Sequence, residues 1–342
     1  MSNHTLSSRF RAATGSNWYL HVEDPARIDA YLRTELNFLL PGEKVQNVQP
    51  AGEGNMNLSL RVYTERRRFI LKQSRPWVAK FPDLDAPVER LLIERDFARA
   101  VQGDHFLSGH MPELLRTDTG NYVLILEDLG QIDDLTSIYQ QGRNITANQL
   151  DELLEYAGRL HRIPGQDFPK NRALRQLNHA HIFDLPFRPD NGFPLNALHP
   201  GLADLARPYQ HDERLRAVVT ELGKRYLGPG RSLIHGDYYP GSFLQTRDRL
   251  YVIDAEFAHC GLPEFDLGVL LAHLLVARTP EERLLQVNER YRRPPNFDVS
   301  LVRKFCYVEV MRRLIGIAQL PMDLSLEERQ ALLERARVGL LE

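Results

Sequence analysis

Two short apolar runs that each end in an aspartate constrain this chain more than any other feature. The first run, Leu233-Ile234, leads into His235-Gly236-Asp237, and the second, Val252-Ile253, ends at Asp254. A hairpin-like interval with residues 245–249 at its tip separates them. Short buried strands fix the residues that follow them, so the pattern predicts carboxylates that converge on one site.

Length and composition narrow the class of protein. The chain has 342 residues, enough for two lobes, and its 43% hydrophobic and 26% charged content is ordinary for a globular protein. A net charge of -2 predicts no general attraction to nucleic acid or to anionic membranes. Cys260 and Cys306 cannot build a disulfide framework, and residues 1–13 do not resemble a signal peptide. We therefore expect a cytoplasmic protein that binds neither nucleic acid nor membrane, and a homodimer remains open.

The pattern of the first 126 residues predicts a small lobe that combines strands and helices. Asp24 and Pro25 are suited to begin a helix over residues 25–40. Strands are expected over residues 45–50, 58–63, 68–73, 112–116 and 122–126, joined as antiparallel hairpins. Leu58, Leu60 and Val62 should share one face. A second helix should run from Asp85 to Val101, and its apolar stripe passes close to Glu94.

The composition changes after residue 126. Residues 127–130 form a predicted hinge, and residues 131–342 form a larger lobe that is mostly helical. Helices are expected over residues 147–163, 202–226, 301–319 and 324–341, with a loop-rich connection over residues 164–200. The fold class is therefore α+β, with a sheet lobe and a helical lobe.

The order of polar residues in both lobes suits phosphoryl transfer from a nucleotide. Gly52 to Asn55 lies between two strands and could cover phosphates, although turns of this kind are common. About 20 residues later Lys72 lies in a strand, where it could bind the α- and β-phosphates while a helical glutamate holds it. Glu94 is the first candidate for that partner and Glu89 the second. At the hinge, main-chain groups near Glu127 and Leu129 could bind an adenine.

Asp237 is the candidate base for an acceptor hydroxyl. A lone His-Gly-Asp sequence occurs by chance, and its aspartate usually forms a turn. Asp254, at the end of the second run, changes this interpretation, because the complete order of glycine turn, lysine, glutamate and two aspartates is specific. Asp266 is expected to brace the catalytic loop.

These motifs resemble the aminoglycoside-phosphotransferase and choline-kinase superfamily, whose fold is protein-kinase-like. The similarity runs from about Gly52 to Ile317, and within the superfamily the chain looks most like 5-methylthioribose kinases. Two features favour that branch: Ser242 stands where most of the superfamily has asparagine, and Glu256 adds a second acid after Asp254.

The resemblance implies a role for each of these positions. Asp254 and Glu256 would hold Mg²⁺ with help from Ser242, since Mg²⁺ prefers hard oxygen ligands. Arg312 and Arg313 match a twin arginine that helps form the substrate end of the site, and Tyr238 could line the acceptor pocket. The nucleotide would lie against Gly52, Gly54, Asn55, Lys72, Glu94, Glu127 and Leu129.

The sequence thus predicts an ATP- and Mg²⁺-dependent kinase that phosphorylates a hydroxyl of a small metabolite, with 5-methylthioribose as the first candidate. An aminoglycoside, choline, homoserine or another pentose are alternative acceptors on the same fold. A catalytically silent kinase-like binding module is the alternative of a different class.

Overall fold

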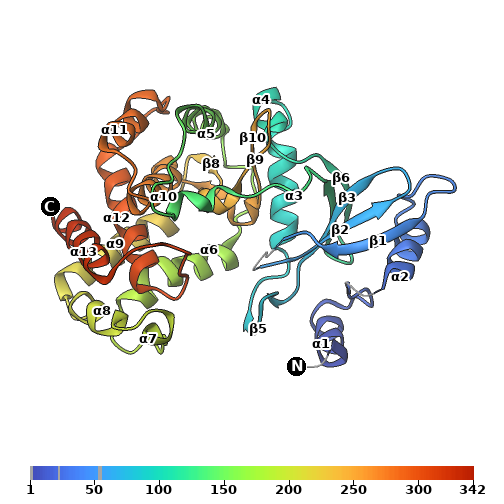
Figure 1. The fold of residues 1–342 in the computed structure, drawn as a ribbon, viewed down its shortest axis with the longest axis horizontal. Coiled ribbons are helices and arrows are strands. Elements are labelled where there is room, and N and C mark those ends of the chain that lie inside the picture. The colour runs from blue at the N-terminus through green and yellow to red at the C-terminus, as the bar shows by residue number, and fades with distance from the viewer. Residues whose placement is uncertain (1–2, 22–23, 53–55) are drawn as a thin grey trace. The chain divides into compact units, whose positions relative to one another are not determined.

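The computed structural model describes residues 3–21, 24–52 and 56–342, and it separates into two compact units, residues 1–131 and residues 132–342 (Figure 1). The first unit contains the predicted sheet and the second is mainly helical. The expected α+β class, with a sheet lobe and a helical lobe, is therefore confirmed.

The first unit is built on an antiparallel sheet with the strand order β1-β2-β3-β7-β6. Its strands are β1 (Val45–Pro50), β2 (Leu58–Thr64), β3 (Arg68–Gln73), β4 (Trp77–Val78), β5 (Phe81–Asp85), β6 (Leu114–Asp118) and β7 (Val123–Glu127). Its helices are α1 (Asn3–Thr14), α2 (Pro25–Ala30), the π-helix η1 (Tyr31–Glu35), α3 (Arg90–Val101) and α4 (His105–Gly109).

The alternation of side chains along β3 gives the main sheet two different faces. Phe69 and Leu71 point into an apolar core that also contains Leu60, Val62 and Ile28 of α2. The residue between successive core positions points the other way. Lys72 therefore lies on the opposite face, where it meets α3.

The helix predicted from Asp85 begins later than expected. Asp85 instead ends β5, which pairs with β4 in a hairpin that local periodicity did not reveal. Trp77 of β4 is fully buried against Phe10 of α1, a helix that was also not predicted, and the guanidinium of Arg9 lies over its ring. The hairpin depends on these contacts with a segment far away in the chain, which explains why the local sequence did not indicate it.

The helix expected over residues 25–40 also differs. Asp24 caps it as predicted, by accepting a hydrogen bond from the Arg27 amide. The helical segment ends at Glu35, however, and soon after it Asn37 adopts a left-handed conformation with φ of 47°.

The second unit consists of helices with short strands between them. Its helices are α5 (Ala147–Leu160), α6 (Arg172–His179), α7 (Leu195–Leu198), α8 (Leu202–Gln210), α9 (Glu213–Leu227), α10 (Pro263–Val276), α11 (Glu281–Arg290), α12 (Val299–Ile315) and α13 (Leu326–Leu341). Shorter turns are η2 (Leu135–Tyr139), η3 (Ala180–Asp184), η4 (Leu185–Phe187), η5 (Pro240–Ser242) and η6 (Ala255–Phe257). The strands are β8 (Ser232–Ile234), β9 (Phe243–Gln245), β10 (Leu250–Val252) and β11 (His259–Gly261).

Two predictions for this unit need correction. The connection over residues 164–200 is not loop-rich throughout, because it contains α6, η3, η4 and α7. The helix expected over residues 202–226 is two helices, since Asp212 caps a new helix by accepting from the Leu215 amide. The hairpin-like interval predicted with residues 245–249 at its tip is present as the paired strands β9 and β10.

Helices α10 and α12 lie side by side at the centre of this unit (Figure 1). Gly268 of α10 permits this approach, because a Cβ there would come within 2.6 Å of the Phe305 Cβ and 2.9 Å of the Val302 carbonyl. This packing fixes α10, which carries Asp266, against α12, which carries Arg312 and Arg313. In the described part of the chain, no helix is both long and apolar enough to cross a membrane.

Candidate functional site

The first unit holds the lysine–glutamate pair that the sequence predicted. Lys72 Nζ on β3 lies 2.6 Å from Glu94 Oε2 on α3, and the two side chains are only 5% and 8% exposed. Glu89, the second candidate, is exposed at the start of α3. Burial raises the cost of separating such charges, so the pair holds the lysine ammonium in one position.

The glycine-containing turn is described only in part. Gly54 and Asn55 lie outside the described residues. Among the described residues other than its chain neighbours, no atom lies within 4 Å of the position that a Cβ of Gly52 would take. After the turn, the Met56 carbonyl accepts a hydrogen bond of 2.6 Å from Arg90 Nη2, which anchors this end of the turn to α3.

The predicted hinge contains a carboxylate, Asp128, that sequence reasoning did not single out. Asp128 accepts from Arg61 Nε at 3.0 Å and lies 3.1 Å from Arg68 Nε. Arg61 also donates to the Gly130 carbonyl at 2.6 Å, and Gly130 adopts a positive φ of 100°. The Glu127 amide donates to the Glu113 carbonyl within the sheet. The main-chain contacts predicted for Glu127 and Leu129 stay predictions.

In the second unit, Asp266 braces the predicted catalytic loop. Its carboxylate accepts from the His235 amide at 2.7 Å and from the Gly236 amide at 2.9 Å, and His161 Nε2 lies 3.1 Å away. Burial opposes ionisation of Asp266, but His161 and His235 outweigh it and lower the pKa of this carboxyl group. The structural role expected for Asp266 is confirmed.

Gly236 is required by the geometry of this loop. Its φ is 82°, and a Cβ would come within 2.3 Å of the Phe257 carbonyl oxygen. Only glycine combines this conformation with so close an approach. The loop that carries Asp237 is therefore pressed against the segment that carries Asp254 and Glu256.

Asp237 follows directly, and its side chain is 24% exposed. Arg313 Nη2 lies 3.7 Å from Asp237 Oδ1, too far for a hydrogen bond but close enough for strong electrostatic attraction. Burial raises the pKa of Asp237, while Arg313 and Arg312 act against that shift. A carboxylate with a raised pKa is a better proton acceptor, which suits a general base.

The three predicted metal ligands lie on the segments that follow Asp237 in the chain. Asp254 adopts a left-handed conformation with φ of 62°, Glu256 is 4% exposed, and the Ser242 hydroxyl donates to the Asp237 carbonyl at 3.0 Å. Besides burial, the negative charges of both Asp237 and Asp254 raise the pKa of the Tyr239 hydroxyl.

These oxygens are the kind of ligand that Mg²⁺ prefers, so the residues fit the predicted ion. Across residues 3–21, 24–52 and 56–342, His, Cys, Asp and Glu side chains form no ready-made group of three that could hold a metal. The metal role of Asp254, Glu256 and Ser242 stays a prediction.

Both predicted arginines bind one buried carboxylate that the sequence analysis did not identify. Glu309 Oε1 accepts from Arg312 Nη1 at 2.7 Å and from Arg313 Nε at 2.6 Å. Burial opposes ionisation of Glu309, but the two guanidinium groups prevail and lower its pKa. The spacing i, i+3 and i, i+4 on one helix was a usable signal for this cluster.

A histidine and a tyrosine extend this cluster. His273 Nε2 lies 3.3 Å from Glu309 Oε1, and its Nδ1 lies 2.7 Å from the Tyr139 hydroxyl. Burial lowers the pKa of His273 to about 4, so its imidazole is neutral near pH 7. A neutral ring then donates from Nε2 to the carboxylate and accepts the tyrosine hydroxyl at Nδ1.

The structure corrects the assignment of Tyr238 to the acceptor pocket. Tyr238 is fully buried, and its hydroxyl donates to the Leu153 carbonyl at 2.8 Å. It is therefore a core residue whose polar end is already satisfied. The aromatic ring beside Asp237 is that of Tyr239, over which the Arg313 guanidinium lies 5.0 Å from the centroid.

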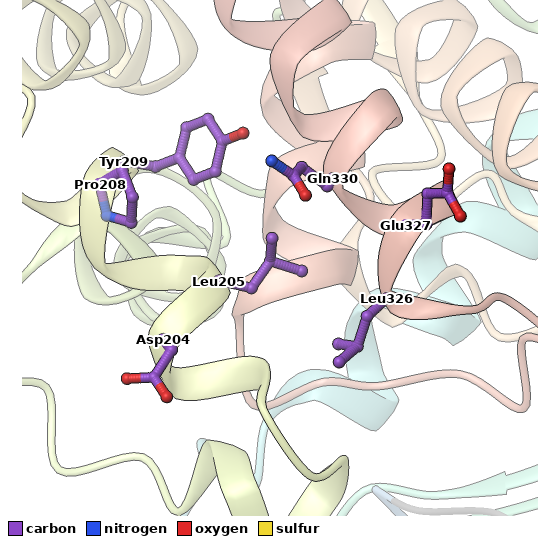
Figure 2. Close-up of a pocket in the computed structure, with 7 residues that line it drawn as sticks. All are labelled: Asp204, Leu205, Pro208, Tyr209, Leu326, Glu327 and Gln330. Carbon is purple, nitrogen blue, oxygen red and sulfur yellow. The ribbon is translucent and has the colours of Figure 1, made fainter.

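A separate pocket of about 410 Å³ lies between α8 and α13. Figure 2 shows Leu205 and Tyr209 of α8 on one side and Leu326 and Gln330 of α13 on the other. None of the predicted site residues lines this pocket.

Comparison with curated proteins finds relatives over about two thirds or more of this chain. A methylthioribose kinase of Erwinia tasmaniensis is 28% identical over 254 residues, which cover 70% of this chain and 62% of that protein. A methylthioribose kinase of Exiguobacterium sibiricum is 26% identical over 270 residues, which cover 74% of this chain and 67% of that protein. The match thus spans roughly three fifths to two thirds of each relative's length.

Solved structures share the fold. A choline kinase from Streptococcus pneumoniae has a TM-score of 0.53 at 17% identity, covering 92% of this chain and 99% of its own. A spectinomycin phosphotransferase solved with ADP and spectinomycin has a TM-score of 0.51 at 13% identity, covering 92% of this chain and 96% of its own. These similarities establish a kinase-like fold and nothing finer.

A family model described as the phosphotransferase enzyme family matches residues 47–301. That segment contains Lys72, Glu94, Asp237, Asp254 and Glu256, and it makes up most of the chain. The chain belongs to the phosphotransferase enzyme family.

Proposed function

We propose that this protein is an ATP- and Mg²⁺-dependent kinase that transfers the γ-phosphoryl group to a hydroxyl of a small metabolite, with 5-methylthioribose as the first acceptor to test. The observation that carries the proposal is the position of Asp237. It lies on a loop braced by Asp266, with Arg313 3.7 Å away. Family membership and the relatives named methylthioribose kinase support it.

In the proposed reaction, Asp237 orients the acceptor hydroxyl and takes its proton as the new O–P bond forms. The bond between the γ-phosphorus and the β,γ-bridging oxygen breaks, and ADP leaves. Arg313 would stabilise negative charge on the group in transit. Lys72, held by Glu94, would bind the α- and β-phosphates of the nucleotide.

The remaining roles follow the sequence-based predictions. Mg²⁺ held by Asp254 and Glu256, with Ser242 assisting, would neutralise charge on the phosphate oxygens. Main-chain groups near Glu127 and Leu129 would bind adenine, and the turn with Gly52, Gly54 and Asn55 would cover the phosphates.

The charges near Asp237 favour a neutral acceptor. Asp237 and Glu309 carry two negative charges, and Arg312 and Arg313 carry two positive charges, so the cluster is balanced. A cationic choline or aminoglycoside would meet two guanidinium groups without a spare carboxylate in this cluster. A neutral sugar adds no charge and leaves the balance intact.

A panel of acceptors tests the proposal. ATP consumption with Mg²⁺ would be measured for 5-methylthioribose, ribose, homoserine, choline and an aminoglycoside, and the first should give the highest kcat/KM. No turnover with 5-methylthioribose would end that assignment. If neither ATP nor ADP with Mg²⁺ raised the melting temperature, the protein would be a silent binding module instead.

Replacement of the proposed base provides the mechanistic test. Asp237→Ala should reduce kcat at least about a thousandfold, because no other group takes the hydroxyl proton. Binding of ATP, measured by calorimetry, should change by less than about threefold. A near-normal rate for this variant would remove Asp237 from the mechanism.

A further inference from the structure

Arg313 and Asp237 lie at attractive range, yet they do not form a hydrogen-bonded ion pair. Their nearest atoms are 3.7 Å apart. A guanidinium and a carboxylate with freedom to approach normally close into a short, often bidentate, pair. Some other contact must therefore hold Arg313 in place.

Glu309 supplies that contact. It accepts from Arg313 Nε at 2.6 Å, and the Ala318 carbonyl accepts from Nη1 at 3.4 Å. The Tyr239 ring covers one side of the guanidinium at 5.0 Å. Three separate contacts thus fix this side chain, and Glu309 provides the shortest of them.

Glu309 is itself fixed within the second unit. Its side chain is 1% exposed, and Arg312 and His273 bind the same carboxylate oxygen as Arg313. A buried carboxylate with several charge-assisted hydrogen bonds does not change position easily. Glu309 can therefore act as a rigid anchor for Arg313.

We propose that Glu309 is a positioning residue that holds the Arg313 guanidinium beside Asp237 while preventing a closed ion pair between them. This inference rests on the proposed kinase reaction. With the Glu309 charge removed, Asp237 becomes the nearest carboxylate to Arg313. A closed pair would occupy the oxygens that must accept the acceptor proton, and it would move the guanidinium away from the transferring group.

The test is a double-mutant cycle on the full chain, with ATP, Mg²⁺ and the best acceptor of the panel. Glu309→Gln keeps the shape of the side chain and should lower kcat about thirtyfold or more, while KM for ATP changes less than twofold. In an Arg313→Gln background the same substitution should change kcat less than twofold, because the guanidinium that Glu309 positions is absent. In an Arg312→Gln background the thirtyfold effect should persist.

A second variant covers the case in which Glu309→Gln does not fold. His273→Gln removes one support of Glu309 without unbalancing charge and should lower kcat about threefold, again only when Arg313 is present. Glu43→Gln is the matched control: Glu43 is fully buried and bound to Arg67 in the first unit, and its loss should leave kcat unchanged.

The outcomes separate the two proposals. An effect of Glu309→Gln that is the same with and without Arg313 would overturn the positioning role while the kinase assignment stands. If the effect of Glu309→Gln disappeared in the Arg312→Gln background instead, Glu309 would act through Arg312, and the proposed positioning of Arg313 would also be overturned. A wild-type protein without turnover on any acceptor would refute the kinase proposal, and the positioning role with it.

Discussion

At the scale of single residues, Asp266 shows how one carboxylate can shape the predicted catalytic loop. Its two oxygens accept from two consecutive amides, those of His235 and Gly236, and leave neither donor unsatisfied in the core. The next residue is Asp237. The position of the proposed base thus depends on the carboxylate of Asp266, which belongs to helix α10.

Asp266→Asn should damage both folding and activity. An amide presents one acceptor oxygen instead of two, so one buried backbone donor loses its partner. We expect the free energy of unfolding in urea to fall by about 2–4 kcal/mol and kcat to fall at least about tenfold. Asp248→Asn, on an exposed loop, should alter neither quantity, and equal losses in both variants would contradict the bracing role.

At the scale of elements, α3 organises the first unit from two successive turns. Glu94 holds Lys72, and Arg90, one turn earlier, donates to the carbonyls of Arg75, Pro87, Met56 and Trp77. Arg90 is 1% exposed. A single guanidinium therefore joins the start of α3, the β4–β5 hairpin and the residue that follows the glycine-containing turn.

Arg90→Met should loosen this arrangement. Methionine fills a similar volume but donates nothing, so buried carbonyls lose a partner and the free energy of unfolding should fall by about 2–4 kcal/mol. Urea unfolding followed by circular dichroism would measure the change. Arg66→Met, an exposed position on the β2–β3 turn, should cost less than about 0.5 kcal/mol. Unchanged stability of Arg90→Met would contradict the structural role.

At the scale of the whole molecule, two buried histidines link stability to pH. Burial lowers the pKa of both His259 and His273 to about 4. In the unfolded chain a histidine has a pKa near 6.5. Between these pH values the imidazoles are protonated in the unfolded state but not in the folded state. Their contribution to the free energy of unfolding is therefore fully present above about pH 6.5 and decreases as the pH falls toward 4.

The free energy of unfolding should therefore drop by about 2 kcal/mol per histidine between pH 8 and pH 5. Urea titrations at several pH values would measure this slope. His259→Phe should remove about half of the slope, whatever it does to stability at pH 8. A stability that stays constant between pH 8 and pH 5 would show that these imidazoles are not buried and neutral.

Local patterns predicted a large part of this protein. The alternation of Leu58, Leu60 and Val62 indicated a strand with one buried face. The order of the motifs also indicated that Lys72 pairs with Glu94 and that Asp266 braces the loop before Asp237. Strands and helices follow from the spacing of apolar residues, which a short window of sequence contains. The wrong or missing elements, such as the β4–β5 hairpin and α1, depend on contacts between distant segments.

The sequence by itself thus determined the α+β class, the two compact parts and the family, because period and motif order are local properties of the chain. Only the tertiary structure decided which of the adjacent residues Tyr238 and Tyr239 lies in the core and which lies next to Arg313. Tyr238 packs into the core while Tyr239 lies beside Asp237 and Arg313. It alone also revealed that Glu309 holds both arginines and that Asp128 binds Arg61 and Arg68. These choices depend on burial and on the directions of side chains in space, which spacing along a chain does not specify.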